Sequence, residues 1–264
     1  MTKAGPGDKI KVGVWQLLII ALFFACWELI SLSGIVFHRL LPSPWQVFIA
    51  AVELLRNGKF FSHLLYSLHQ IFWGFGLGAG FGLIVGLVLG GNRTLGSVFE
   101  PLVLWLAPVP KIIIYPIFLW FLGIGNASRI AMGVASAFFP VVIYTASGVR
   151  QVKPVFIDAA RLLGARRMQV ASKIYLPAIL PSLWLGLRLA AAVSLVGILL
   201  AETKLSQQGV GFLIIEYYNH FQITEMYAVL LLVFVVGIAL NAAFGWLQAH
   251  VIILRQARSA DSFQ

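Results

Sequence analysis

One cation inside an apolar stretch is the first candidate for chemistry. Lys111 lies in "WLAPVPKIIIYPIF", which Pro108, Pro110 and Pro116 interrupt. Each proline removes a backbone hydrogen bond, so a helix here should bend or open, and such breaks are tolerated where they face protein or a water-filled cavity. A charge within a membrane span usually faces a pathway. We therefore expect Lys111 to contact an anionic solute, or alternatively to reach the membrane interface or pair with Glu100.

Further polar residues near the spans extend this candidate solute pathway. Pro110 and Tyr115 flank Lys111, and Glu202 lies at the end of another apolar run. Glu202 is expected either to line an outer vestibule or to cap a helix or pair at the surface. We include Pro110, Lys111, Tyr115 and Glu202 in the predicted pathway.

The sequence lacks the residue patterns of bond-making chemistry. The spans hold no clustered His, Asp and Glu set and no nucleophile motif, and the five histidines have no metal-ligand spacing. There is no G-x-x-x-x-G-K-[ST] phosphate loop, so the chain has no nucleotide site of its own. A single cysteine, Cys26, excludes an intrachain disulfide. We predict a transport component rather than an enzyme, with no metal or cofactor bound by this chain.

A polar segment, residues 154–177, separates two of the apolar stretches. Pro154 suits the first turn of a helix, and the apolar residues that follow it share one face. Gly164 is placed to end this helix in a left-handed cap. A second short helix should then run from Arg166 to Pro177, which ends it. Such a helix-turn-helix could cover its own helix ends or fit a groove on a soluble partner.

The composition places these residues in a membrane protein. The 264 residues are 60% hydrophobic and 11% charged, with a mean hydropathy of +0.93, far more apolar than a soluble domain. The net charge of +10 would suit nucleic acid, but the basic residues fall in short connections between apolar runs, which is typical of contact with a lipid bilayer. We expect no nucleic-acid partner.

Six stretches are long enough to span a bilayer, which needs about 20 apolar residues per helix. We expect an all-α fold with spans near 12–34, 65–91, 98–122, 129–149, 182–201 and 226–254. Segment 40–64 holds prolines and charges and is expected to lie at the outer surface as an amphipathic helix. The first apolar run continues past Cys26, so we interpret it as a retained span rather than a signal peptide.

The distribution of lysine and arginine sets the orientation. With the N-terminus inside, the inner connections hold twelve of the nineteen basic residues and the outer ones hold five, among them Arg129 and Lys204. We therefore expect both termini, and segment 154–177, on the cytoplasmic side.

The second span contains a regular stripe of glycines. Gly74, Gly78, Gly82 and Gly86 recur every four residues, and four residues turn a helix by about 400°, so they share one slowly drifting face. A smooth face lets another helix backbone come close. We expect packing within one subunit, with a subunit interface or sliding surface as the alternative.

Segment 154–177 resembles the "EAA" loop of bacterial ABC importer permeases, whose pattern is E-A-A, three residues, G, nine residues, then I-x-L-P. Asp158-Ala159-Ala160, Gly164 and Ile174-Tyr175-Leu176-Pro177 fall at those offsets, and only Asp158 departs from the usual Glu. "LPSPWQV", residues 110–130 and residues 201–214 are similar to segments of the sulfonate, taurine, nitrate and bicarbonate branch. Ala107 departs from the arginine that relatives often have there.

The resemblance implies a type I ABC importer permease fold, a single permease domain over 1–264, and several partners. Two ABC ATPase subunits, which bind ATP and Mg, would dock on the coupling residues Asp158, Ala159, Ala160, Gly164, Ile174, Leu176 and Pro177. A second copy of the permease and an extracytoplasmic substrate-binding protein would complete the complex in the bacterial inner membrane. The cargo would be a small anion such as a sulfonate, taurine or nitrate.

An ion-coupled secondary transporter is the alternative. Such proteins usually show internal repeats and a functional carboxylate within a span. We find no repeat, and Glu28, Glu100 and Glu202 lie toward the ends of the predicted spans.

Overall fold

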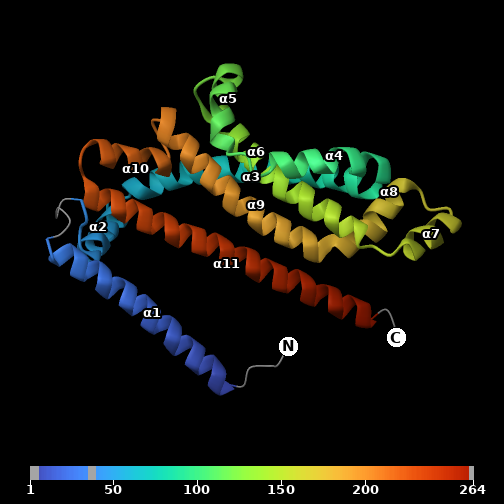
Figure 1. The fold of residues 1–264 in the computed structure, drawn as a ribbon, viewed down its shortest axis with the longest axis horizontal. Helices are drawn as coiled ribbons and strands as arrows, with labels where there is room; N and C mark the ends of the chain where they lie inside the picture. The colour runs from blue at the N-terminus through green and yellow to red at the C-terminus, as the bar shows by residue number, and fades with distance from the viewer. Residues whose placement is uncertain (1–5, 35–39, 262–264) are drawn as a thin grey trace. The chain divides into compact units, whose positions relative to one another are not determined.

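The structure is a computed structural model that describes residues 6–34 and 40–261, and these residues form helices joined by turns, with no strand among them. The predicted all-α class is confirmed. The chain ends, 1–5 and 262–264, for which we expect a cytoplasmic location, lie outside the described residues. The elements in chain order (Figure 1) are α1 (Pro6–Leu32), α2 (Pro44–Arg56), α3 (Lys59–Gly91), α4 (Arg93–Leu106), the 3-10 helix η1 (Lys111–Ile114), α5 (Tyr115–Leu122), α6 (Asn126–Arg150), α7 (Pro154–Leu162), α8 (Arg167–Val170), the π-helix η2 (Ala171–Tyr175), α9 (Leu176–Leu205), α10 (Val210–Asn219) and α11 (Ile223–Asp261).

Within the described residues, five helical stretches are long and apolar enough to cross a membrane: Val12–Leu32, Lys59–Gly91, Asn126–Arg150, Met168–Leu205 and Ile223–His250. The predicted third span, 98–122, is instead a pair of helical pieces, Arg93–Leu106 and Lys111–Leu122, bent by 92°. The prolines predicted to interrupt it explain the bend, because Pro108 and Pro110 occupy the break. Figure 1 shows α5 directed away from α4 at this point.

Segment 40–64 also divides differently from the prediction. The surface helix α2 ends at Arg56, and the last six residues of the segment already belong to α3, which starts at Lys59. Gly58, in a left-handed conformation with φ +68°, lies at the junction, where a residue with a side chain would be strained.

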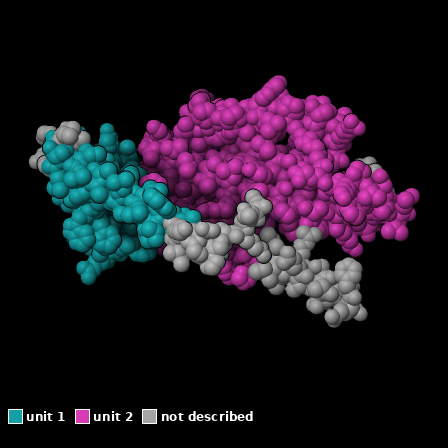
Figure 2. Space-filling view, turned by 60° about the horizontal axis from the view of Figure 1, so that its bottom comes forward, with its two compact units in different colours: residues 1–61, 213–233 teal, residues 62–212, 234–264 magenta. Residues whose placement is uncertain are grey.

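The contacts of the chain divide it into two compact units (Figure 2). Unit 1 comprises residues 1–61 and 213–233, and unit 2 comprises residues 62–212 and 234–264. The chain passes between the units three times, inside α3, α10 and α11, so each of these helices belongs to both.

Unit 1 is organised around the start of α2. Ser43 caps α2 by accepting a hydrogen bond from Gln46 N, while the Gln46 side chain accepts one from Ser43 N, and Pro44 suits the first turn. Trp27 Nε1 of α1 donates to Pro42 O at 3.1 Å. The α1 span has no buried residue in its apolar window, so its side chains are available to lipid or to another chain.

In unit 2 the glycine stripe of α3 lies against α6. A Cβ placed on Gly78 would lie 2.7 Å from Val134 O, on Gly82 2.8 Å from Phe138 O, and on Gly86 2.6 Å from Thr145 Cβ. The contacted α6 positions advance by about four residues with each glycine, so the two helices run parallel and in register. Gly76 and Gly80, on another face of α3, have nothing within 4 Å.

Helices α6 and α9 complete the core of unit 2 as an antiparallel pair. Gly133 of α6 lies against Ile198, and Gly148 near the end of α6 lies against Ile179 at the start of α9. The buried cluster between these helices consists mostly of small or β-branched side chains, including Ala137, Val141 and Ala190. Close packing of backbones is the main force that associates helices in lipid, so the core of unit 2 rests on small residues.

Candidate functional site

Segment 154–177 begins as the predicted helix and turn. After α7, Gly164 has φ +77°, and Leu163 N donates to Ala159 O while Ala165 N donates to Ala160 O at 3.0 Å. A bond that spans six residues across a left-handed glycine is the C-cap geometry that satisfies the last carbonyls of a helix. Gly164 therefore stops α7 and turns the chain into α8.

Around this turn the structure leaves large apolar side chains exposed. Leu162 is 89% exposed, Leu163 87% and Met168 77%, and Phe156 on α7 is also exposed. We call these four residues the turn surface. Within the described part of the chain nothing covers them, so the helix-turn-helix does not use its apolar side chains to cover its own helix ends.

The second helix of the segment does not end at Pro177, contrary to the prediction. It runs from α8 through the π-helix η2 into α9, so that Ile174 lies in η2 while Leu176 and Pro177 open α9. A proline at position 177 has no N–H for Lys173 O, and its ring would clash with that carbonyl in an α-helix. The wider turn, in which Leu176 N donates to Ala171 O, admits the proline without a break. From Arg167 onward the segment is therefore continuous with α9, whereas the Gly164 turn separates α7 from it.

Helix α8 and the π-helix η2 also adjoin the corner between α3 and α4. Gly91, Asn92 and Arg93 line a pocket of about 580 Å³ together with residues of α8 and η2, including Tyr175. Segment 154–177 therefore lies next to the end of α3 and the start of α4.

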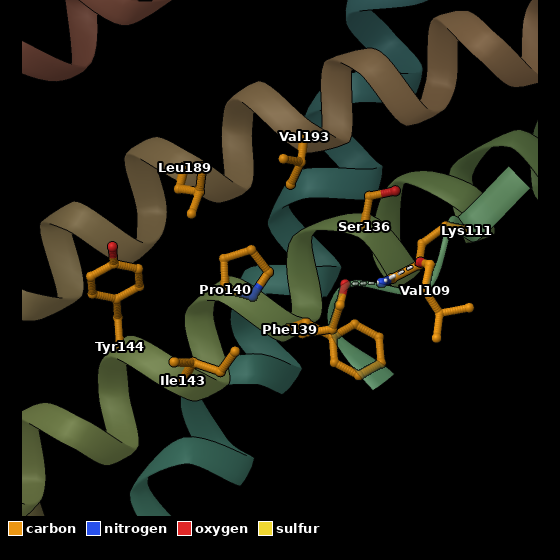
Figure 3. A pocket seen from close by; sticks show the side chains of 10 residues that line it. Val109, Lys111, Ser136, Phe139, Pro140, Ile143, Tyr144, Leu189 and Val193 are labelled. Atoms are coloured by element: carbon orange, nitrogen blue, oxygen red, sulfur yellow. Dashed lines mark hydrogen bonds between the residues drawn. The ribbon is translucent and has the colours of Figure 1, made fainter. Parts of the chain in front are cut away.

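Lys111 lines a second pocket of about 330 Å³ in unit 2 (Figure 3). Its wall combines residues of α6 and α9, and Figure 3 shows Lys111 and Tyr144 at its opposite ends, with Phe139 and Pro140 between them. The pocket is predominantly apolar, with a few polar groups, which is typical of sites for small molecules.

The ammonium of Lys111 is already occupied by backbone oxygens. Lys111 Nζ donates to Leu106 O at 3.1 Å, Ala107 O at 2.5 Å and Val109 O at 2.9 Å, and lies 4.5 Å from the Phe139 ring centroid. These carbonyls close the C-terminal end of α4, where a cation is favoured by the helix dipole. Lys111 thus caps a helix beside the pocket. Its alternative partner, Glu100, pairs instead with Arg150.

Glu202 lies neither at the surface nor in a vestibule, because it is fully buried. Ser67 Oγ donates to its carboxylate at 2.8 Å, and Gly211 N donates to Oε2 at 2.8 Å. Val210 N in turn donates to Ser67 Oγ. The carboxylate joins α3, α9 and the start of α10, so it fixes the connection after α9 rather than contacting solute in this state.

The four predicted pathway residues are therefore not brought together. Pro110 precedes η1 next to Lys111, Tyr115 is buried in a cluster with Met132 and Ala201, and Glu202 belongs to the separate network above.

Two polar residues of this end of unit 2 were not among the predicted site residues. Ser67 is buried beside Glu202, and Arg129, assigned to an outer connection, is only 4% exposed within α6. Two signals were available for Arg129: it lies in segment 110–130, which resembles the family, and it lies in the first turn of a helix, where a basic residue is disfavoured.

The structure thus combines helices that are long and apolar enough to cross a membrane with an exposed helix-turn-helix between two of them. Residues 78–252 match the family described as "Binding-protein-dependent transport system inner membrane component". The chain belongs to this family of ABC importer permeases, as predicted, and is a multi-pass inner-membrane transport subunit rather than an enzyme. Its family implies an ATPase and a substrate-binding protein as partners.

Several relatives are similar over most of their length. The chain is 34% identical over 232 residues to a putative aliphatic sulfonates transport permease protein of Bacillus subtilis, covering 88% of this chain and 84% of that one. It is 30% identical to a bicarbonate transport system permease protein of Synechococcus elongatus, covering 87% and 86%. Among solved structures, an inward-facing MetNI methionine ABC transporter matches with a TM-score of 0.62 at 22% identity, covering 70% of this chain and 92% of that chain, which shows a shared fold.

Proposed function

We propose that this permease couples to its ATPase through residues 154–177 and conducts a small oxyanion, of the sulfonate or bicarbonate kind, across the inner membrane. Two copies of the permease would associate with two ATPase subunits, which bind ATP and Mg, and with an extracytoplasmic binding protein. Segment 154–177 and both chain ends would lie in the cytoplasm. Family membership argues against the alternative of an ion-coupled secondary transporter.

The turn surface is the observation that supports coupling at this segment. Exposed leucines at a helix turn are unfavourable in water, at about 1.5–3 kcal/mol for each large apolar side chain left unburied. A groove on a partner that accepts an amphipathic helix would remove this penalty. Asp158, Ala159, Ala160 and Gly164 occupy the same segment and would contact or shape that interface.

The mechanical path follows from helix continuity. Closure of the ATPase dimer would displace α7 and α8, and because α8 continues through η2 into α9, the displacement would reach the core of unit 2 directly. Helix α9 packs on α6, and α6 packs on the glycine stripe of α3. Packed interfaces of this kind switch between discrete arrangements rather than deforming gradually.

The cargo class is supported by the relatives. The two described above are named for aliphatic sulfonates and for bicarbonate, and both solutes are small anions with several oxygens on one centre. The Lys111 pocket, with Pro110 beside it, is the candidate pathway, and Lys111 would contribute positive potential there while capping α4.

Replacing Leu163 with Ser tests the coupling proposal. Because Leu163 is 87% exposed, the substitution should leave folding intact. It should lower co-purification with the cognate ATPase about tenfold or more, as expected for loss of a buried anchor. The measurement is the ratio of ATPase to permease after affinity purification.

Phe221→Ser is the matched control, because Phe221 is 85% exposed in the connection between α10 and α11, expected on the opposite side of the membrane. ATPase recovery should be unchanged in this variant. Full recovery in Leu163→Ser, or equal loss in both variants, would contradict docking at the turn surface.

A further inference from the structure

A polar cavity in unit 2 lies apart from both the Lys111 pocket and the coupling segment. It has a volume of about 640 Å³ and is formed by the start of α3, the first turn of α6 and the segment that follows α9. Tyr66, Arg129, Lys204 and the amide side chains of Gln207 and Gln208 are among its lining residues. Two cations and no acid are present in that lining.

Arg129 is the buried component of this cavity. It is 4% exposed, and its hydrogen-bond partners are all neutral: Nη1 donates to Tyr66 Oη at 2.9 Å and to Asn126 Oδ1 at 3.4 Å, and Nη2 donates to Leu205 O at 3.4 Å. Its Nε has no partner within the described structure. A guanidinium has five N–H donors arranged to bind two oxygens of one oxyanion.

Arg129 forms no direct ion pair with a described residue, although the buried Glu202 lies close enough to interact with its charge through space. Among the described residues, no Asp or Glu lies within ion-pair distance of Arg129 or Lys204. The buried acid of this region, Glu202, already accepts hydrogen bonds from Ser67 and Gly211. Arg129 also lies in the first turn of α6, where the helix dipole disfavours a cation. A buried charge without a direct ion pair is costly, and an anion bound to Arg129 would reduce that cost.

The position of the cavity suits solute entry. Tyr66 lies near the start of α3 and Gly91, beside the coupling segment, at its end. The 25 residues between them span about 37 Å at ~1.5 Å per residue, which exceeds the ~30 Å hydrocarbon core of a bilayer. The cavity is therefore at the face of the membrane opposite the coupling segment, and the exposed side chains of Lys204 and Gln208 leave it open to solvent.

We infer that this cavity is a binding site for a small oxyanion, with Arg129 as the bidentate donor and Lys204 as the second cation. That this anion is also the transported solute rests on the proposed function. Binding itself depends only on the chain. Solute released by the binding protein would be held here before it passes toward the Lys111 pocket.

Calorimetric titration of the purified full-length permease with sodium methanesulfonate, and separately with sodium bicarbonate, tests the site. We expect saturable binding by the wild type and at least tenfold weaker binding by Arg129→Gln and Lys204→Gln. Arg129→Lys, which keeps the charge but loses the two-pronged donor, should also bind less tightly than the wild type. Arg56→Gln, which removes an exposed arginine of α2, is the matched control and should bind normally.

Melting temperatures of all variants separate loss of binding from loss of folding, and Lys204→Gln, at an exposed position, keeps the test valid if Arg129→Gln does not fold. Unchanged affinity in both Lys204→Gln and Arg129→Lys would overturn the inference. Equal competition by sodium chloride, or an effect of the substitutions only on docking of the binding protein, would also overturn it. If the anions bind as expected but the reconstituted complex does not import them, the site stands and the proposed cargo fails.

Discussion

Gly164 has the most demanding backbone conformation in the coupling segment. Its φ of +77° lies in the left-handed region, where other residues lose about 1–2 kcal/mol and β-branched residues are particularly strained. No other atom lies within 4 Å of a Cβ placed there, so conformation rather than space determines which residues fit.

We therefore predict that Gly164→Val reduces solute uptake several-fold relative to ATP hydrolysis, because the turn between α7 and α8 can no longer hold its direction. Gly164→Asn should be much milder, since asparagine tolerates the left-handed region. Uptake and ATPase activity of the complex in proteoliposomes, measured side by side, give the ratio. If valine and asparagine behave alike, the left-handed turn is not what coupling requires.

The polar residues show which contacts could not be predicted from the sequence. The left-handed position of Gly164 followed from local spacing alone. The burial of Glu202 did not, because its partner Ser67 is 135 residues away and its second partner is a backbone N–H, which any residue could supply. Lys111 was singled out as a charge within an apolar stretch, but its three carbonyl partners depend on the bend after α4, whose geometry cannot be predicted from periodicity.

At the scale of elements, the stripe of α3 is a one-sided feature. A Cβ on Gly78, Gly82 or Gly86 would lie less than 3.0 Å from α6, and one on Gly74 would lie 3.0 Å from it, whereas a Cβ on Gly76 or Gly80 would meet no described residue within 4 Å. The same helix thus provides its own control positions for any substitution.

We predict that Gly86→Ala lowers the stability of the purified protein by about 1–3 kcal/mol, the usual range for overpacking, because the new Cβ would lie 2.6 Å from Thr145 Cβ. Gly80→Ala should be neutral or stabilising by up to about 1 kcal/mol, as alanine favours a helix. Thermal unfolding in detergent compares the two. Equal effects at both positions would mean that α3 and α6 do not pack as described.

Some of the helices and their boundaries could be predicted from the sequence, and others could not. The six apolar stretches and the interruption at Pro108 and Pro110 were recognisable because length, hydropathy and missing N–H groups are local properties. The continuity of α8 with α9 was not, because Pro177 has the local properties of a helix end. The π-helix η2 is what reconciles this proline with an unbroken backbone, because its wider turn does not need the missing N–H.

For the whole molecule, orientation in the membrane is the property that ties the proposals together. Under the proposed function, segment 154–177 would face the ATPase, and the cavity of Arg129 would face the side from which solute arrives. Both requirements are met only if the two ends of unit 2 lie on opposite sides of the bilayer.

The single cysteine makes this testable. In a Cys26→Ser background, Ser172→Cys in η2 should react with a membrane-impermeant maleimide only in inside-out vesicles, and Gln207→Cys only in right-side-out vesicles. Both positions are exposed, so failure to label would not result from burial. Reaction of both cysteines from the same side would refute the orientation, and with it cytoplasmic coupling.

The π-helix η2 also determines a direction. Each residue added to a helix rotates the following residues by about 100° around the helix axis. The wide turn at Ala171–Tyr175 therefore sets the rotation of α7 about the axis of α9. In a homologue with one residue fewer in this turn, the leucines of the turn surface would point in a different direction around the axis of α9. Whether a permease can pair with the ATPase of another transporter would then depend on this rotation as much as on the chemistry of the contacting side chains.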